Sequence, residues 1–251
     1  MRLLFETKEE RKIWKHYKSF GSFSRVLESS DILDIAVSKP WYKTDSENTL
    51  LSGTRYMRLK RLIDIVLSFT FLMLIMPVLI ACAIAIKIDS PGPVFFIQDR
   101  TGFGGKPFKI LKLRTMRRDA DKIKRKYAHL NTLNWPDFKI PDDPRITRVG
   151  SFLRKTSLDE IPQFLNVLFG DMSMVGPRPT SFSASTYDLW HTARLDIKPG
   201  ITGLWQISGR NDIEFDERVR MDVAYINNVS LTLDLKIMVR TLTAVLRQEG
   251  A

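Results

Sequence analysis

The longest apolar stretch of the chain runs from Ile65 to Ile86 and contains no charged residue. Its only hydroxyl side chains are those of Ser68 and Thr70. A helix needs about 20 apolar residues to cross the hydrocarbon core of a bilayer. The stretch therefore favours a membrane-embedded helix, expected within residues 58–90, over the buried core helix of a soluble domain.

The two flanks of this helix and the proline within it bear on whether it crosses the membrane. Lys60 and Arg61 precede the apolar stretch and Lys87 follows it, so both ends prefer the cytoplasmic side. Pro77 removes a backbone donor near the middle, which predicts a kink. A kinked helix with both ends on one side would enter one leaflet and return. The residues alone leave a kinked helix that spans the membrane equally open.

Shorter alternating patterns follow the helix and predict a β-hairpin. Residues 89–93 read Asp-Ser-Pro-Gly-Pro, a strong turn signal. The segments 94–97 and 108–113 then read as two strands joined by the glycine-rich turn at 102–106. That turn does not match a phosphate-binding loop, because its lysine is followed by proline and the glycine spacing differs.

The remaining pattern is that of short helices and loops. Helices are expected at 116–130, 158–169, 214–228 and 233–248, and a Pro- and Asp-rich loop at 134–147. The predicted fold class is α+β and mostly helical: a kinked, re-entrant membrane helix plus a small cytoplasmic domain of short helices and a β-hairpin.

Three parts are expected along the chain. Residues 1–57 form a polar N-terminal extension in which we find no readable chemistry, 58–90 form the membrane helix, and 91–251 form the catalytic domain. Residues 8–18 are charged and no apolar core follows within the first 30 residues, so we expect no secretory signal peptide.

The net charge of the chain limits the classes of molecule that it is expected to bind. Lys and Arg number 39 against 28 Asp and Glu, a net charge of +11, which suits nucleic acid, anionic lipid or a phosphorylated substrate. No nucleic-acid-binding motif is present. The single cysteine, Cys82, excludes an intramolecular disulfide framework and a multi-cysteine zinc site.

The candidate chemistry centres on adjacent carboxylates at Asp159 and Glu160. Ser157 stands three residues before Glu160, which predicts a capping box and a helix start, and an ordinary cap is the simplest reading. Arg154 and Lys155 lie just upstream, where they would keep a carboxylate ionised and hold phosphates. Adjacent carboxylates also suit a divalent ion that bridges phosphate oxygens.

Three downstream positions add to this picture. Arg178 lies between two prolines, whose stiff backbone suits a directed grip on a phosphate, although a structural turn with a solvated arginine is the alternative. Trp205 would either stack on a ligand or pack in the core. Asp234 is charged within an apolar stretch, so we expect a partner such as Lys236 or an arginine.

From about Arg58 to its end the chain resembles the bacterial sugar transferases, also called monotopic phosphoglycosyl transferases. The resemblance rests on the apolar helix with its proline and on five further segments in order: Asp89-Ser-Pro-Gly-Pro-Val-Phe-Phe, Lys112-Leu-Arg-Thr-Met, Leu153-Arg-Lys-Thr-Ser-Leu-Asp-Glu-Ile-Pro-Gln, Val175-Gly-Pro-Arg-Pro and Lys198-Pro-Gly-Ile-Thr-Gly.

The resemblance implies a mechanism of covalent catalysis. Asp159 would attack the β-phosphate of a UDP-sugar, release UMP and pass the sugar phosphate to a polyprenyl phosphate. Glu160 would join Asp159 in holding Mg²⁺, with Mn²⁺ as a substitute. Arg154 and Arg178 match arginines linked to phosphate binding. Further candidates for binding substrate or phosphate are Lys112, Arg114, Arg210 and Asp234.

The Gly203-Leu-Trp-Gln-Ile-Ser-Gly-Arg-Asn-Asp segment resembles the hexose-1-phosphate branch, which uses UDP-galactose or UDP-glucose. The resemblance also implies a re-entrant helix at the cytoplasmic face of the bacterial inner membrane. Expected partners are a UDP-sugar, undecaprenyl phosphate, membrane lipids and downstream glycosyltransferases, and a homodimer is left open. The rival hypotheses are a non-catalytic membrane scaffold and a protein that only binds anionic ligands.

Overall fold

The structure is a computed structural model of the 251-residue chain and describes residues 53–132, 140–183, 186–208 and 213–246. Most of the expected N-terminal extension, the start of the loop expected at 134–147, and Arg210 therefore lie outside the described residues. Within them the fold is mostly helical, as the sequence predicts, and it contains two small sheets, of which the sequence predicts only the hairpin.

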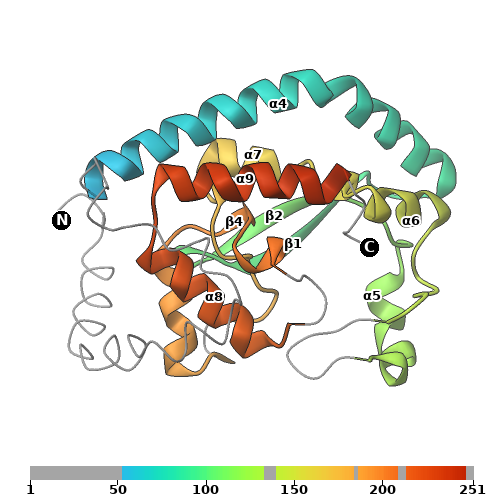
Figure 1. The fold of residues 1–251 in the computed structure, drawn as a ribbon. Coiled ribbons are helices and arrows are strands. Elements are labelled where there is room, and N and C mark those ends of the chain that lie inside the picture. Colours follow the sequence, from blue (N-terminus) through green and yellow to red (C-terminus); the bar gives the residue numbers. More distant parts are fainter. Residues whose placement is uncertain (1–52, 133–139, 184–185, 209–212, 247–251) are drawn as a thin grey trace.

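The apolar stretch forms one long helix, α4, which spans Gly53–Asp89 and begins ahead of the expected boundary at residue 58. Figure 1 shows it bent into an arc over the rest of the domain. Pro77 lies within this helix. Only 11% of its most apolar part is buried, which excludes the core helix of a soluble domain. By length and composition it is the one described helix able to cross a membrane.

The N-terminal half of α4 turns its polar side chains inward. Tyr56, Lys60, Asp64 and Ser68 recur every four residues and are all buried, while most of the apolar side chains between them are exposed. Asp64 accepts hydrogen bonds from the backbone N–H of Met174 at 2.9 Å and from a nearby serine. The helix is therefore attached to the domain by polar contacts and presents its apolar face outward.

The hairpin forms as predicted. Strand β1 (Phe95–Thr101) pairs with antiparallel β2 (Pro107–Leu113), and the one-turn helix η2 (Phe103–Gly105) makes the glycine-rich turn. In this register Phe96 lies opposite Lys112.

A second, parallel pair of strands, β3 (Ser173–Val175) and β4 (Gly200–Thr202), has no signal in the sequence pattern. It depends on two glycines, because a Cβ on Gly200 would lie 2.1 Å from the backbone nitrogen of Gly176. The Gly-Pro-Arg-Pro and Lys-Pro-Gly-Ile-Thr-Gly segments are thus held side by side by a contact that only glycine permits.

Two of the four helices expected after the hairpin form close to their expected bounds, and the other two are shortened or divided. Those at 214–228 and 233–248 form as α8 and α9, but the helix expected at 116–130 starts only at residue 120 and continues as a 3₁₀ helix. The remaining described helices are α5 (Ala120–Ile123), η3 (Lys124–Leu130), α6 (Arg148–Lys155), η4 (Leu158–Glu160), α7 (Gln163–Phe169), η6 (Leu189–Asp196), η7 (Trp205–Ile207), α8 (Phe215–Asn227) and α9 (Leu231–Leu246).

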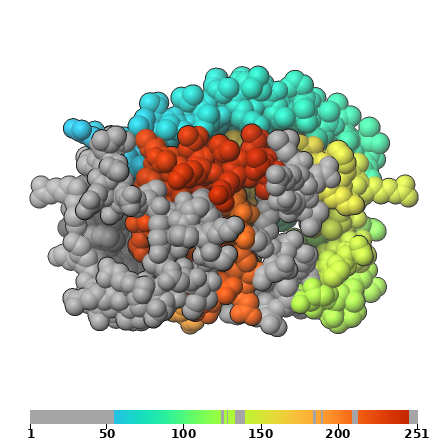
Figure 2. Space-filling model, in the orientation of Figure 1, coloured from blue at the N-terminus to red at the C-terminus, as the bar shows by residue number. Residues whose placement is uncertain are grey.

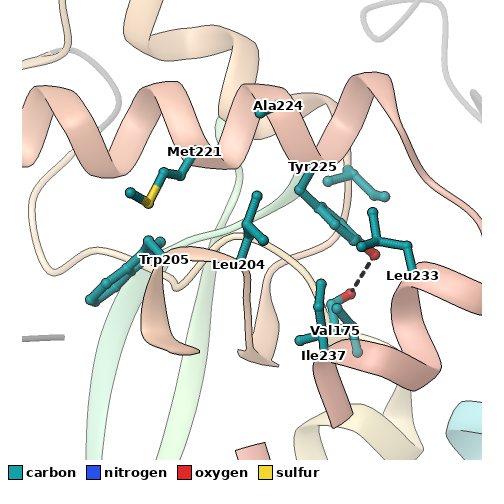
Figure 3. Packing of buried hydrophobic residues seen from close by; sticks show 9 residues of the cluster. Val175, Leu204, Trp205, Met221, Ala224, Tyr225, Leu233 and Ile237 are labelled. Carbon is teal, nitrogen blue, oxygen red and sulfur yellow. Dashed lines mark hydrogen bonds between the residues drawn. The ribbon is translucent and has the colours of Figure 1, made fainter. Parts of the chain in front are cut away.

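The main core lies where α8 and α9 pack on β3 and η7. Figure 3 shows Trp205 packed close to Met221, with Leu204 and Tyr225 alongside. The Tyr225 hydroxyl donates a hydrogen bond to the carbonyl oxygen of Val175 at 3.3 Å. Of the two expected roles for Trp205, packing is confirmed.

Candidate active site

A cavity of about 1260 Å³ opens between the hairpin, the α6–η4 segment and α4, and both Asp159 and Glu160 line it. Its wall carries an excess of positive charge. The described basic side chains that line it number eight, and they are Arg100, Lys112, Arg114, Arg117, Arg118, Arg145, Arg154 and Arg178, against the five acidic side chains of Asp121, Asp142, Asp143, Asp159 and Glu160. A concave site with this charge is built to hold an anion.

The backbone around Asp159 differs from the expected capping box. Ser157 has a left-handed backbone (φ 56°) and makes no side-chain cap hydrogen bond. Only two residues separate α6 from η4, so the chain reverses sharply at Ser157 and its hydroxyl cannot reach the next turn. The helix expected at 158–169 is split: Asp159 and Glu160 lie on the single turn η4, and α7 begins after Pro162. The positive charge next to Asp159 and Glu160 therefore comes from neighbouring cationic side chains and not from the start of a helix.

Glu160 is gripped by two cations. Its carboxylate accepts a hydrogen bond from Lys112 Nζ at 2.7 Å and from both terminal nitrogens of Arg178, at 2.5 and 3.2 Å. Burial alone would raise the pKa of Glu160, but the charges and hydrogen bonds of Arg178 and Lys112 hold it far below its usual range. Glu160 is therefore an ionised, fixed anchor for two cavity cations.

The Asp159 carboxylate, unlike that of Glu160, is not held by a cationic side chain in the part of the chain that the structure describes. Its side chain is buried, borders the cavity and accepts no hydrogen bond from the described residues. Burial, followed by the adjacent charge of Glu160, raises its pKa to about 6, against the pull of Lys112 and Arg154. The pair thus contains one anchored carboxylate and one carboxylate with free oxygens, which is what a nucleophile requires.

The β3–β4 contact sets the direction of Arg178. The backbone N–H of Gly200 donates to the carbonyl oxygen of Pro177 at 2.9 Å, and Arg194 donates to the carbonyl oxygen of Arg178 at 2.8 Å. Arg194 is itself held by buried Asp222 at 2.7 Å. The arginine between two prolines is thereby fixed from both sides, as the sequence suggests.

Asn166 and Arg61 hold α7, the helix after the carboxylate pair. The Asn166 side chain accepts from the backbone N–H of Leu111 at 3.0 Å and donates to the carbonyl oxygen of Lys109 at 2.7 Å, which pairs α7 with the free edge of β2. Arg61 of α4 donates to the last carbonyl oxygens of α7, including that of Leu168 at 2.8 Å. The long helix, the hairpin and the carboxylate pair therefore form one connected unit.

The other predicted residues fall in different places. Arg154 lines the cavity and donates to the Thr115 hydroxyl at 2.9 Å, and burial lowers its pKa although Asp159 opposes this. Arg114 also lines the cavity, but its guanidinium donates to the carbonyl oxygens of Ser90 and Pro91 and so fixes the turn after α4.

Asp234 is not among the residues that line this cavity. It lies in a buried network where it accepts hydrogen bonds from Lys60 at 2.8 Å, Tyr56 at 2.9 Å and Tyr225 at 2.6 Å. Its partner is Lys60 of α4 rather than the expected Lys236. Sequence distance conceals this pairing, because the two residues are 174 positions apart.

We expect Asp234→Ala to lower stability rather than substrate affinity. The Lys60 ammonium would be left buried without a counter-charge, which costs about 3–5 kcal/mol. Thermal unfolding in detergent should shift to lower temperature, and the double variant Lys60→Met/Asp234→Leu should recover part of the loss. A raised KM for the nucleotide sugar with unchanged unfolding would instead give Asp234 the substrate-binding role that the sequence suggests.

Arg100 is a cavity cation that the sequence reasoning missed. It lies on β1, donates to Gln98 at 2.8 Å, and its buried Nε has no partner among the described residues. Burial and nearby Arg178 lower its pKa to about 10. The sequence did contain a signal for Arg100. The two-residue period of β1 places Arg100 on the same face of the strand as Phe96, which pairs with Lys112.

The sequence analysis also missed a buried ion pair between Asp143 and Arg145, at 2.6 Å, which borders the cavity.

The site offers few side chains that could coordinate a metal ion. Among the described residues no group of three or more His, Cys, Asp or Glu side chains converges. Mg²⁺ commonly takes one or two carboxylates and completes its shell with water and substrate phosphates. Asp159 fits that requirement, whereas both oxygens of Glu160 already accept hydrogen bonds from cations.

A buried carboxylate that borders a cationic cavity, beside a long exposed apolar helix, is the arrangement expected of a membrane-associated protein that binds anions. The family model described as "Bacterial sugar transferase" matches residues 55–248. The chain therefore belongs to the bacterial sugar transferase family.

Three relatives illustrate this membership. The chain is 48% identical over 194 residues to the galactosyl transferase CpsE of Streptococcus agalactiae, which covers 76% of this chain and 43% of that protein. It is 40% identical over 197 residues to the exopolysaccharide production protein ExoY of Sinorhizobium fredii, covering 76% and 87%. It is 42% identical over 206 residues to the UDP-glucose:undecaprenyl-phosphate glucose-1-phosphate transferase of Caulobacter vibrioides, covering 76% and 71%. The chain thus spans less than half of the first relative and most of the other two.

Proposed function

We propose that the chain transfers a hexose 1-phosphate, galactose or glucose, from a UDP-sugar to undecaprenyl phosphate, the first step of exopolysaccharide, capsule or O-antigen assembly. The observation that carries this proposal is the division between Asp159, free and facing the cavity, and Glu160, fixed by Lys112 and Arg178. The names of the relatives support the two hexoses and the lipid acceptor.

In the first half-reaction an oxygen of ionised Asp159 attacks the β-phosphorus of the UDP-sugar. The bond between that phosphorus and the bridging oxygen breaks, UMP leaves with the electron pair, and an acyl phosphate joins the sugar phosphate to Asp159. Arg178 and Lys112 stay anchored on Glu160 and stabilise charge that develops on the phosphoryl oxygens.

In the second half-reaction a phosphate oxygen of undecaprenyl phosphate attacks the same phosphorus. The bond to Asp159 breaks, the carboxylate is restored and undecaprenyl diphosphate sugar forms. Arg100 and Arg154 also line the cavity and form no ion pair with a buried carboxylate of the described residues, and they suit the diphosphate and the lipid phosphate.

Mg²⁺ belongs to this proposal with Asp159 as its protein ligand. When bound it supplies positive charge to the diphosphate oxygens and helps the leaving group depart. Glu160 then acts through Lys112 and Arg178 rather than as a ligand. A direct check is the pH titration of Asp159 with and without Mg²⁺, because a bound metal ion should lower the pKa of this carboxyl below the value of about 6 to which burial raises it.

Re-entry of α4 into the cytoplasmic leaflet of the bacterial inner membrane is also part of the proposal. Its support is the arc in Figure 1, in which both ends of α4 descend toward the domain, together with the basic residues that flank the apolar stretch. Cysteines introduced near both ends of α4 should resist a membrane-impermeant thiol reagent applied from the periplasm. Labelling at one end only would establish a crossing helix and refute re-entry.

The test of the transfer activity is a panel of UDP-sugars with undecaprenyl phosphate and Mg²⁺ in membranes of cells that express the chain. UMP release and a lipid-linked sugar phosphate are expected with UDP-galactose or UDP-glucose. If no UDP-sugar releases UMP or yields a lipid product, the chain is instead a scaffold or a binding protein. Downstream glycosyltransferases as partners and a homodimer stay predictions.

A further inference from the structure

The cavity does not end at the carboxylates. It continues into a section between α4 and α9 whose side chains are mostly apolar, which we call the apolar arm. Six residues define it: Leu67, Phe71 and Ile75 of α4, and Met238, Leu242 and Val245 of α9. No charged residue of α4 or α9 lines the cavity, in contrast to the cationic wall around Asp159.

Two threonine hydroxyls that border the arm are satisfied by one another and by the backbone. The hydroxyls of Thr202 and Thr241, which also line the cavity, are 2.6 Å apart, and Thr241 donates to the carbonyl oxygen of Ile237 at 2.8 Å. They therefore offer little to a polar ligand, and an apolar one costs them no hydrogen bond.

The outer rim of the arm is exposed and apolar. Leu242 is 61% exposed and Val245 is 39% exposed, although both line the cavity. Figure 2 shows α9 directly below α4 in this view, and α4 presents its own exposed apolar side chains. The arm is thus continuous with the helix face that a membrane would cover.

We propose that the apolar arm binds the first isoprene units of the polyprenyl phosphate acceptor. This inference rests on the proposed function, which requires a lipid phosphate at Asp159 and a path for its tail back to the bilayer. The arm is the section of the cavity bounded by the membrane helix, and its length of apolar wall suits an uncharged prenyl chain. The cationic wall holds the head and the arm holds the start of the tail.

The experiment places a carboxylate in the arm and compares it with a matched position outside. Leu242→Asp lies on the rim, whereas Leu235→Asp lies on the same helix, is similarly exposed at 59%, and does not line the cavity. Two reactions are measured on the purified full chain in detergent: UMP exchange into the UDP-sugar, which needs no acceptor, and transfer to undecaprenyl phosphate at varied concentration.

We expect Leu242→Asp to raise the KM for undecaprenyl phosphate roughly tenfold or more while its rate of UMP exchange stays near that of the wild type, since an apolar contact with the lipid tail is replaced by charge. It should also reduce the preference for undecaprenyl phosphate over farnesyl phosphate. Leu235→Asp should behave like the wild type in both reactions. Exchange in the wild type is the check on the proposed function itself, because without exchange that function fails before the arm is tested.

Three results would overturn the inference while leaving the transfer activity intact. The first is an unchanged KM for undecaprenyl phosphate in Leu242→Asp. The second is an equal loss in Leu235→Asp, which would make the outer face of α9 a general membrane contact. The third is a change of oligomeric state in Leu242→Asp, measured by light scattering, which would place a second copy of the chain on the arm.

Discussion

Replacing Asp159 by Asn should abolish sugar-phosphate transfer, with kcat lower by about 10⁴-fold or more. The amide keeps the size and position of the side chain but has no oxygen with the charge needed to form the acyl phosphate. UMP exchange and the covalent sugar-phosphate adduct, detected by intact-protein mass spectrometry, should both disappear. Turnover near the wild-type rate, or an adduct on another residue, would show that the nucleophile lies elsewhere.

The raised pKa of Asp159 gives the same prediction a pH signature. Since the carboxylate must be ionised to attack, UMP exchange in the wild type should fall as pH drops through about 6. The linkage to stability has the opposite sign. A carboxylate whose pKa is raised by folding lowers stability as pH rises from its unfolded value towards 6, and the full cost applies above that. Asp159→Asn should therefore unfold at the same or a higher temperature than the wild type at pH 7.5, which confirms that it is folded.

Replacing Arg178 by Ala should lower kcat/KM for the UDP-sugar by about 10²–10³-fold, the usual cost of removing one preorganised donor at a developing charge. Glu160 would keep only Lys112 as a partner, so its carboxylate would also be held less firmly. Arg178→Lys should recover only part of the loss, because a lysine cannot reproduce the two-nitrogen grip on Glu160.

The matched control for this loss is Arg148→Ala, which removes an exposed arginine that does not line the cavity. It should leave kcat/KM within about twofold of the wild type. An equal loss in both variants would mean that overall charge, rather than the geometry of Arg178, governs substrate binding. Full recovery by Arg178→Lys would argue against the two-nitrogen grip.

Local patterns in the sequence were sufficient for the hairpin, the long helix and the last two helices. The alternation of residues 108–113 and the uncharged stretch from Ile65 to Ile86 both report on neighbours a few positions away. Asp159 as a candidate needed the resemblance as well, because an acidic residue near a helix start is more often a cap.

The features that the sequence did not disclose depend on contacts between distant segments. The β3–β4 pair is made by two glycines in close approach, and the Lys60–Asp234 pair joins opposite ends of the described chain. The capping box failed at Ser157 because the geometry of the preceding helix, rather than local preference, sets its backbone. Arg100 was missed because its face of the strand becomes meaningful only once the hairpin register is known.

The inward polar stripe of α4 has a practical consequence for anyone who wishes to handle this protein without detergent. Deleting the helix would remove the hydrogen bonds from the backbone of Met174 to Asp64 and from Arg61 to the end of α7. A truncated domain should therefore lose contacts that hold the carboxylate pair in place. A water-soluble version should instead keep the inner stripe and exchange outward side chains such as Leu74 and Phe69 for polar ones. The helix is a structural wall of the enzyme as well as its anchor.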